Sequence, residues 1–64
     1  MAEWKKEARR LARDFYLSKY EIRMIFARVE ELYATKEMPS YYKGNRNEFL
    51  YDKAQKAIMS KIYA

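Results

Sequence analysis

The chain contains no cysteine and no histidine, and it has a single glycine and a single proline among its 64 residues. Without cysteine no disulfide can form, and a zinc finger is excluded because its ligands are cysteine and histidine. The same absences remove the usual general base and the most readily activated nucleophile of enzymes. A glycine-rich phosphate loop is also missing, so we predict a protein that is not an enzyme and needs no cofactor or metal.

Long apolar runs are absent as well. No stretch approaches the roughly 20 apolar residues that a membrane-spanning helix needs. The first residues, Met-Ala-Glu-Trp-Lys-Lys, are too charged for a secretory signal. We therefore expect a soluble, cytoplasmic protein with no membrane partner. A chain of this length forms one domain and buries only about 60% of the surface of its unfolded form, so its core is thin.

Gly44 and Pro39 lie close together, which leaves the rest of the chain free of helix breakers. Apolar residues recur at steps of three and four in three segments, as they do on one face of a helix. These predicted core stripes are Trp4, Ala8, Leu11, Ala12 and Phe15, then Ile22, Ile25, Phe26, Val29, Leu32 and Tyr33, then Leu50, Tyr51, Ala54, Ala57, Ile58 and Ile62. The sequence predicts an all-α, compact three-helix domain over 1–64, with helices at about 2–16, 18–36 and 46–63, a tight first corner and a longer second loop.

The chain is basic, because 14 Lys and Arg residues face nine Asp and Glu residues and give a net charge of +5. That balance favours polyanions such as nucleic acid. The basic candidates for contact with nucleic acid are Lys5, Lys6, Arg9 and Arg13 on the first helix, Lys19, Arg23 and Arg28 on the second, and Lys43 and Arg46 in the second loop. The alternative is that these side chains form an ordinary solvated surface.

The first corner carries the strongest local pattern. Ser18 and Glu21 have the spacing of a capping box, and Leu17 with Ile22 occupy the positions of a hydrophobic staple. The order of residue types from Leu11 to Ser18, followed by Ile22 and Ile25, resembles helix-turn-helix DNA-binding domains. The chain departs from that family at Tyr16, where a glycine able to adopt positive φ is usual.

The resemblance to helix-turn-helix domains implies a DNA-binding regulator, with DNA preferred to RNA. In that family the second helix reads a groove of the duplex, and neighbouring cations hold its phosphates. The groove-facing positions correspond here to Ser18, Lys19, Tyr20, Arg23, Met24 and Ala27, and the phosphate contacts to Arg9, Arg13 and Arg28.

A second resemblance covers some of the same residues. Leu17-Ser18, Ile22-Arg23, Val29 and Leu32-Tyr33 are similar to the small helical subunit of type III CRISPR effector complexes, as are, more loosely, Pro39, Tyr41 or Tyr42, Arg46 and Ala57-Ile58. That family meets guide or target RNA through basic residues, although this chain is shorter and would lack one helix. The resemblance implies a subunit of a larger, RNA-containing complex.

A protein-interaction module, such as an inhibitor or adaptor, is the rival prediction. Some apolar residues lie outside the core stripes and would suit a homodimer or a larger protein partner; they are Tyr20, Met24, Phe49, Met59 and Tyr63. The alternative is that Phe49, Met59 and Tyr63 wrap the edges of the core and that the flank with Tyr20 and Met24 packs on the third helix. In the second loop, Tyr41 and Tyr42 are open to two interpretations. They can stack on unpaired bases, or they can fold over the core as a lid.

Overall fold

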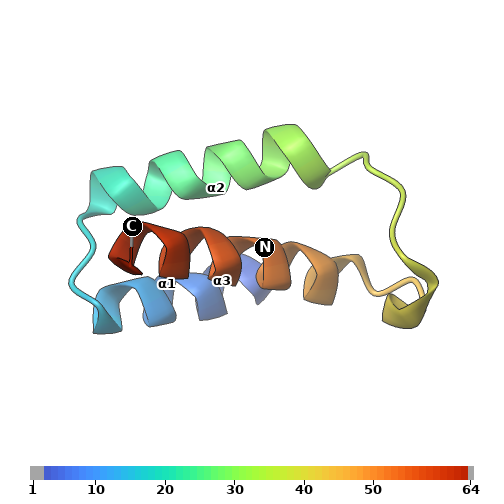
Figure 1. Ribbon diagram of the computed structural model, residues 1–64, viewed down its shortest axis with the longest axis horizontal. Helices are drawn as coiled ribbons and strands as arrows, with labels where there is room; N and C mark the ends of the chain where they lie inside the picture. Colours follow the sequence, from blue (N-terminus) through green and yellow to red (C-terminus); the bar gives the residue numbers. More distant parts are fainter. Residues whose placement is uncertain (1–2, 64) are drawn as a thin grey trace.

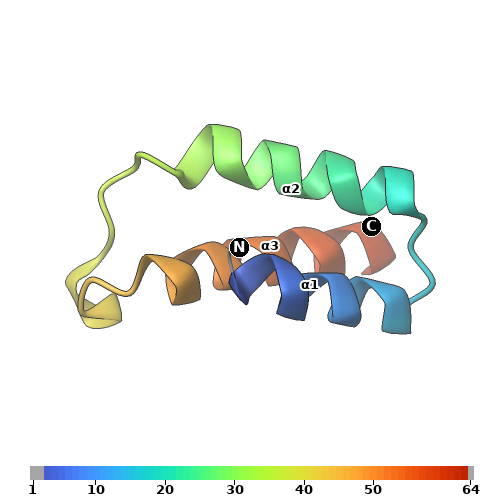
Figure 2. The same ribbon diagram turned by 180° about the vertical axis from the view of Figure 1, so that it is seen from behind.

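A computed structural model describes residues 3–63, with the side chain of Tyr63 left out. It contains the α-helices α1 (Glu3–Asp14), α2 (Lys19–Tyr33) and α3 (Arg46–Tyr63), and one short 3₁₀ helix, η1 (Ser40–Tyr42). The described residues form no strand, so the predicted all-α, three-helix fold is confirmed. In Figures 1 and 2, α1 and α3 lie side by side and run in one direction, and α2 packs across them in the opposite direction.

The first corner is a Schellman motif followed directly by a capping box. The N–H of Leu17 donates to the carbonyl of Ala12 at 3.1 Å, and the N–H of Tyr16 donates to that of Arg13 at 2.9 Å. Tyr16 takes the left-handed conformation, with φ 63°, which costs a residue with a Cβ about 1–2 kcal/mol. The turn that glycine would favour therefore forms without glycine.

The predicted capping box at the start of α2 is confirmed. Ser18 accepts the N–H of Glu21 at 3.1 Å through its hydroxyl oxygen, and its own N–H donates to the Glu21 carboxylate at 3.0 Å. These bonds satisfy N–H groups that a helix start leaves without partners. The second helix therefore begins where the local sequence pattern places it.

The core contains most of the predicted stripes, and the aromatic rings make edge-to-face pairs. Trp4 of α1 meets Phe26 of α2 with ring centroids 5.2 Å apart. The buried core is Trp4, Ala8, Ala12, Ile22, Phe26, Val29, Tyr42, Phe49, Leu50, Ala54 and Ile58. Two predicted core residues, Phe15 and Leu32, are instead exposed, because they lie at the margins of their stripes, where three short helices leave no neighbour to cover them.

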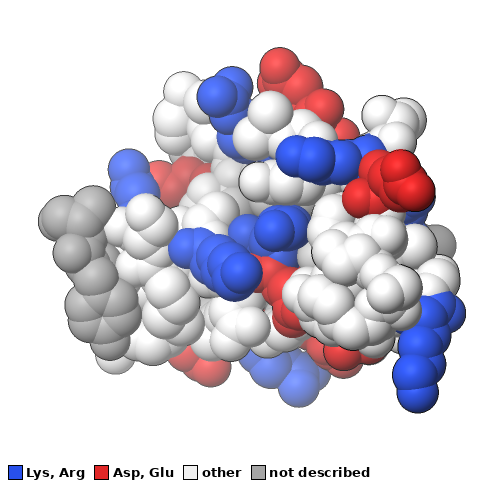
Figure 3. All heavy atoms as spheres, turned by 45° about the vertical axis from the view of Figure 1, so that its right-hand side comes forward, with Lys and Arg blue, Asp and Glu red and all other residues white. Residues whose placement is uncertain are grey.

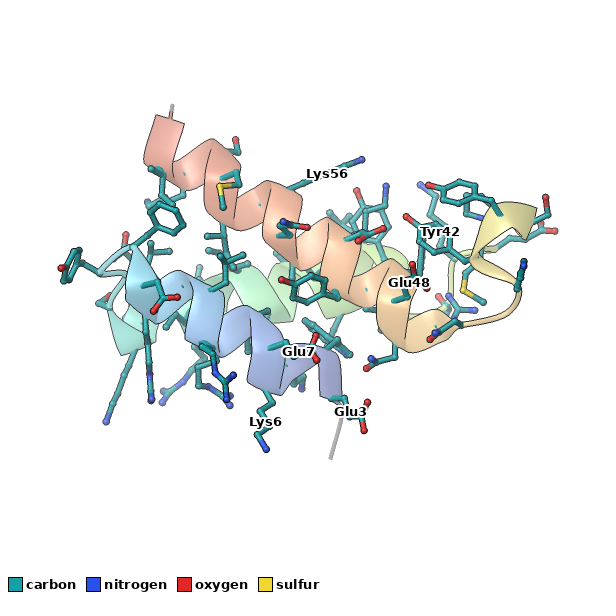
Figure 4. The ribbon with its side chains drawn as sticks, turned by 90° about the horizontal axis from the view of Figure 1, so that it is seen from below. Glu3, Lys6, Glu7, Tyr42, Glu48 and Lys56 are labelled. Atoms are coloured by element: carbon teal, nitrogen blue, oxygen red, sulfur yellow. The ribbon has the colours of Figure 1, made fainter. Side chains whose placement is uncertain are left out.

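α2 ends at Tyr33, three residues before the predicted end. The chain then crosses to α3 through η1, and Tyr42 points from η1 toward α3 (Figure 4). Its ring meets Phe49 edge to face at 5.2 Å, and its hydroxyl donates to Asp52 at 2.8 Å. Of the two interpretations of this tyrosine, the structure shows the lid over the core, whereas Tyr41 beside it remains exposed.

Phe49 belongs to the core, which is one of the two places predicted for it, and the prediction of a protein-interface role for it is wrong. Its side chain is only 2% exposed. Tyr33, the last residue of α2, and Tyr42 of η1 both pack against it edge to face. The second loop folds back onto the first turns of α3, and helical spacing alone could not predict the neighbour that this loop supplies.

Candidate nucleic-acid interface

An open groove with a volume of about 430 Å³ runs between α1 and α2. Its floor is apolar, formed by Ile22 and Phe26, and its walls carry the basic side chains of both helices. We call this surface the α1–α2 groove, defined by Lys5, Arg9 and Arg13 of α1 and Lys19, Ile22, Arg23, Phe26, Ala27 and Glu30 of α2. The fold therefore brings six of the predicted nucleic-acid contacts to one place, the five cations Lys5, Arg9, Arg13, Lys19 and Arg23 and the small residue Ala27.

The spacing of the cations explains why they share a groove. Lys5, Arg9 and Arg13 recur every four residues along α1, and Lys19 and Arg23 do the same along α2. Residues four apart lie on one face of a helix, about 6 Å from one another along its axis. Two rows of positive charge thus face each other across the apolar floor.

Few of these cations have a carboxylate partner. Lys5 pairs with Glu30 at 2.7 Å, and the other ion pair among the described residues joins Lys61 to Glu21 at 3.7 Å. The guanidinium of Arg9 lies over the Phe26 ring, 5.4 Å from its centroid. Arg9, Arg13, Lys19 and Arg23 therefore leave one end of the groove with uncompensated positive charge, which attracts an anion from outside.

The other predicted nucleic-acid ligands lie elsewhere. Lys6 points outward from the α1 side of the bundle (Figure 4). There it shares a second shallow groove with Arg9, Arg10 and Arg13. Ser18 is used as the helix cap, and Lys43 ends η1 with φ 52°. Arg28 faces α3 rather than α1, next to Lys53 and Lys56.

Arg46 has a structural role that the sequence did not reveal. Its guanidinium donates to the carbonyl of Lys36 at 2.6 Å and to that of Tyr33 at 3.2 Å. These carbonyls lie at and just beyond the end of α2, where helices lack internal donors. Arg46 therefore joins α3 to α2, and it lies outside the α1–α2 groove that gathers five of the other predicted cations.

Tyr20 and Met24 are exposed, by 70% and 55%. They do not face α1 but line hollows on the α3 side of α2. Met59, which was proposed for a protein interface, is partly buried. Tyr63, proposed with it, has its side chain outside the described residues.

A second groove, between α2 and α3, contains cations that the sequence reasoning did not select. Adjoining hollows share Met24 and Ile25 at one point and Arg28 and Ala57 at another, and they form what we call the α2–α3 groove. Lys56 projects from α3 on the side away from α1 (Figure 4), and basic side chains gather in the middle of the face shown in Figure 3. The signal for Lys53 and Lys56 was their spacing of three residues, which puts both on one side of a helix.

Two groups in the described structure have shifted pKa values. The pKa of Glu21 is lowered, chiefly because the backbone N–H of Ser18 donates to the Glu21 carboxylate. The Ser18 side chain and the positive charge of nearby Lys61 act in the same direction. The pKa of Tyr42 is raised, first by its hydrogen bond with Tyr41 and then by the hydrogen bond that it donates to Asp52. Burial of the hydroxyl raises it further. Both groups stabilise the fold and neither lies in the α1–α2 groove, so neither indicates acid–base chemistry there.

Two further observations concern the described residues as a whole. None of their helices combines the length and the apolar character needed to cross a bilayer, and their carboxylates form no cluster suited to a metal ion.

A scan of protein-family models, a search of curated proteins and a search of solved structures find no match to this chain.

Proposed function

We propose that this protein binds nucleic acid without catalysis, by holding backbone phosphates in the α1–α2 groove. The observation that carries the proposal is the convergence of Arg9, Arg13, Lys19 and Arg23 from two helices onto one groove, with no carboxylate partner among the described residues. Arginine suits this task because its planar guanidinium donates two parallel hydrogen bonds to a phosphate.

The two resemblances describe possible forms of this proposal. In a helix-turn-helix regulator, α2 would face duplex DNA, with Tyr20, Arg23 and Met24 toward the bases and Arg9 and Arg13 on the phosphates. In a subunit of an RNA-containing complex, the same cations would hold an RNA backbone. Both forms place phosphates on the cations of the α1–α2 groove and differ in the strand that is held there. In the first form the bases would extend beyond this groove to Tyr20 and Met24, which lie on the α3 side of α2.

The experiment is a fluorescence-polarisation titration of labelled duplex and single-stranded DNA and RNA at several salt concentrations. Since four cations would each displace a counterion, we expect log affinity to fall with log salt with a slope of about −3 to −4. Affinity no better than micromolar at low salt, with no salt slope, would contradict the proposal.

A matched pair of charge-reversed variants locates the site. The variant with Arg9→Glu and Arg13→Glu should lose most of its affinity, because it replaces two groove cations with anions. The control with Lys43→Glu and Lys56→Glu has the same net charge, but its substitutions lie outside the α1–α2 groove. Equal losses in the two variants would mean that overall charge, rather than the groove, governs binding.

We propose protein docking as a second candidate function, on the α2–α3 groove. Its apolar part includes Met24 and Leu32, which are exposed although most large apolar residues of the described chain are buried or partly buried. Arg28, Lys53 and Lys56 stand beside it without an ion pair among the described residues. That combination suits an amphipathic helix with an acidic polar face, whereas a second copy of this basic chain would bring like charges together.

A designed amphipathic peptide with a leucine stripe and a glutamate face tests the docking candidate. We expect it to bind at least tenfold more tightly than the same peptide with lysine in place of glutamate. Met24→Ser combined with Leu32→Ser should abolish the difference, and Arg9→Glu combined with Arg13→Glu should leave it unchanged. Equal binding of both peptides, or concentration-dependent dimerisation through this face, would overturn the candidate.

A further inference from the structure

Tyr16 is exposed to an unusual degree for an aromatic residue that also adopts a disfavoured backbone conformation. Its φ is 63° and 94% of its surface is accessible. Glycine usually occupies this position of a Schellman motif because it has no Cβ. The tyrosine ring therefore gains almost no burial in the folded chain to offset the strain of its backbone, and strain of this kind is often retained where a residue has a function.

The neighbours of Tyr16 belong to the uncompensated end of the α1–α2 groove. Its N–H donates to the carbonyl of Arg13 at 2.9 Å, and α2 begins three residues later with Lys19. Tyr20, the next residue of α2, is 70% exposed but lines a hollow on the α3 side of that helix. The corner thus presents one accessible ring, that of Tyr16, three residues from the groove cations Arg13 and Lys19 on either side.

We propose that this corner binds single-stranded nucleic acid in preference to duplex, with an unpaired base stacked on Tyr16 and the adjoining phosphates in the α1–α2 groove. The inference rests on the proposed function and names its ligand class. Aromatic rings beside a cationic groove are the combination by which proteins bind single strands with little sequence preference. In a duplex the bases already stack on one another, so their faces cannot reach the rings, and only the phosphates would remain to be bound.

Tyr41 provides a matched control at the other end of the bundle. It is 72% exposed, close to the value for Tyr20, but it lies in η1, outside the α1–α2 groove. Its hydroxyl donates to that of Tyr42 at 3.0 Å. If any exposed tyrosine sufficed, Tyr41→Ala would weaken binding as much as a substitution at the corner.

The test measures the affinity of the wild type and of Tyr16→Gly, Tyr16→Phe and Tyr41→Ala for three labelled probes. The probes are an oligothymidylate and an oligouridylate of about 15 nucleotides and a DNA duplex of equal length. We expect the single strands to bind at least tenfold more tightly than the duplex. Tyr16→Gly should weaken single-strand binding about 5- to 150-fold, as expected for loss of one stacked base, while Tyr16→Phe and Tyr41→Ala stay near the wild type.

Stability separates loss of stacking from loss of folding. Glycine relieves the positive φ at position 16, so Tyr16→Gly should melt at a higher temperature than the wild type even as it binds single strands less well. Equal or tighter binding of the duplex, or unchanged single-strand affinity in Tyr16→Gly, would overturn the inference. If Arg9→Glu with Arg13→Glu still weakens binding in that case, the proposed function stands and only its ligand class is wrong.

The two single-stranded probes distinguish DNA from RNA as the source of the same chemistry. Stacked bases and bound phosphates are common to both strands, so we expect the affinities to agree within about tenfold. A larger preference for the oligouridylate would indicate contact with the 2′-hydroxyl, and would contradict an affinity that comes only from base stacking on Tyr16 and from the groove cations.

Discussion

The side-chain oxygen of Asn47 accepts the backbone N–H of Trp4 at 2.7 Å. Trp4 lies in the first turn of α1, where N–H groups have no partner within the helix, and Asn47 lies in the first turn of α3. A side chain in the first turn of α3 thereby caps the first turn of α1, and the two bonded residues are 43 positions apart in the chain. This bond fixes the relative position of α1 and α3, and hence the wall of the α1–α2 groove that α1 supplies.

Removing the Asn47 acceptor should destabilise the fold without touching the groove. We expect Asn47→Ala to lower the free energy of unfolding by about 1 kcal/mol, as loss of a helix cap usually does. Asn47→Asp keeps the acceptor and places a negative charge near two helix starts, so it should be as stable as the wild type. Urea unfolding followed by circular dichroism measures both variants, and an Asp variant as unstable as the Ala variant would contradict the capping role.

Ile58 is the most sensitive point of the core, since its side chain is fully buried. Ile58→Ala should cost about 2–5 kcal/mol, which is close to the whole stability of about 3–5 kcal/mol expected from a core of this size. We therefore expect the Ala variant to be largely unfolded at 25 °C. Ile58→Val should remain folded with a loss of about 0.5–1.5 kcal/mol.

Leu32 is the control for the core prediction, because it carries a similar apolar side chain that is 46% exposed. Leu32→Ala should change the free energy of unfolding by about 1 kcal/mol or less. Thermal melts of the three variants and the wild type test this order. A Leu32→Ala variant as unstable as Ile58→Ala would mean that the α2–α3 groove is closed in solution.

The capping box makes stability depend on pH through Glu21. Its pKa is lowered from 4.5 in the folded chain, chiefly by the N–H of Ser18, so the charged carboxylate stabilises the fold at neutral pH. Because the folded pKa lies below the unfolded one, this contribution is complete above about pH 4.5 and is lost as the pH falls through the folded pKa.

Glu21→Gln isolates the charge in this effect, since glutamine can still accept the Ser18 hydrogen bond. We expect the wild type to be more stable than the variant at pH 7, and the difference between them to shrink as the pH falls below the unfolded pKa of Glu21 and through its lowered folded pKa. Urea unfolding at several pH values measures the difference. A constant difference between the two proteins across this range would contradict a role for the charge.

The sequence could predict the helices because their signals are local. The capping box of Ser18 and Glu21 fixes the start of α2, and the spacing of Trp4, Ala8 and Ala12 selects the face of α1 that is buried. Tyr16 shows the limit of local reasoning in the turn. Its side chain disfavours a left-handed conformation, but the helices on either side impose one.

The site was harder to predict because it depends on which helix each face meets. Arg23 and Arg28 are both exposed cations on α2, but Arg23 faces α1 and Arg28 faces α3. That choice follows from the packing of three helices and not from spacing within one of them. Phe49 is likewise covered in part by Tyr42 of the second loop, and the spacing of apolar residues within α3 could not predict that contact.

Arg46→Ala and Arg23→Ala each remove one positive charge, but we expect them to have different effects. The first should lower stability, and the second should weaken binding. Arg46 holds the end of α2 through two carbonyls, so Arg46→Ala should lower the free energy of unfolding by about 1–3 kcal/mol. Where it is folded, it should bind an oligothymidylate like the wild type. Arg23 is exposed in the α1–α2 groove, so Arg23→Ala should change stability by no more than about 0.5 kcal/mol.

The binding half of this prediction has a specific signature. Loss of one phosphate contact should weaken the affinity of Arg23→Ala and reduce the magnitude of its salt slope by about 1, whereas Arg46→Ala should keep the wild-type slope. Urea unfolding gives the stabilities, and titrations at several salt concentrations give the slopes. A reduced slope in Arg46→Ala, measured where urea unfolding shows it folded, would place a phosphate at the second loop and move the interface away from the first corner.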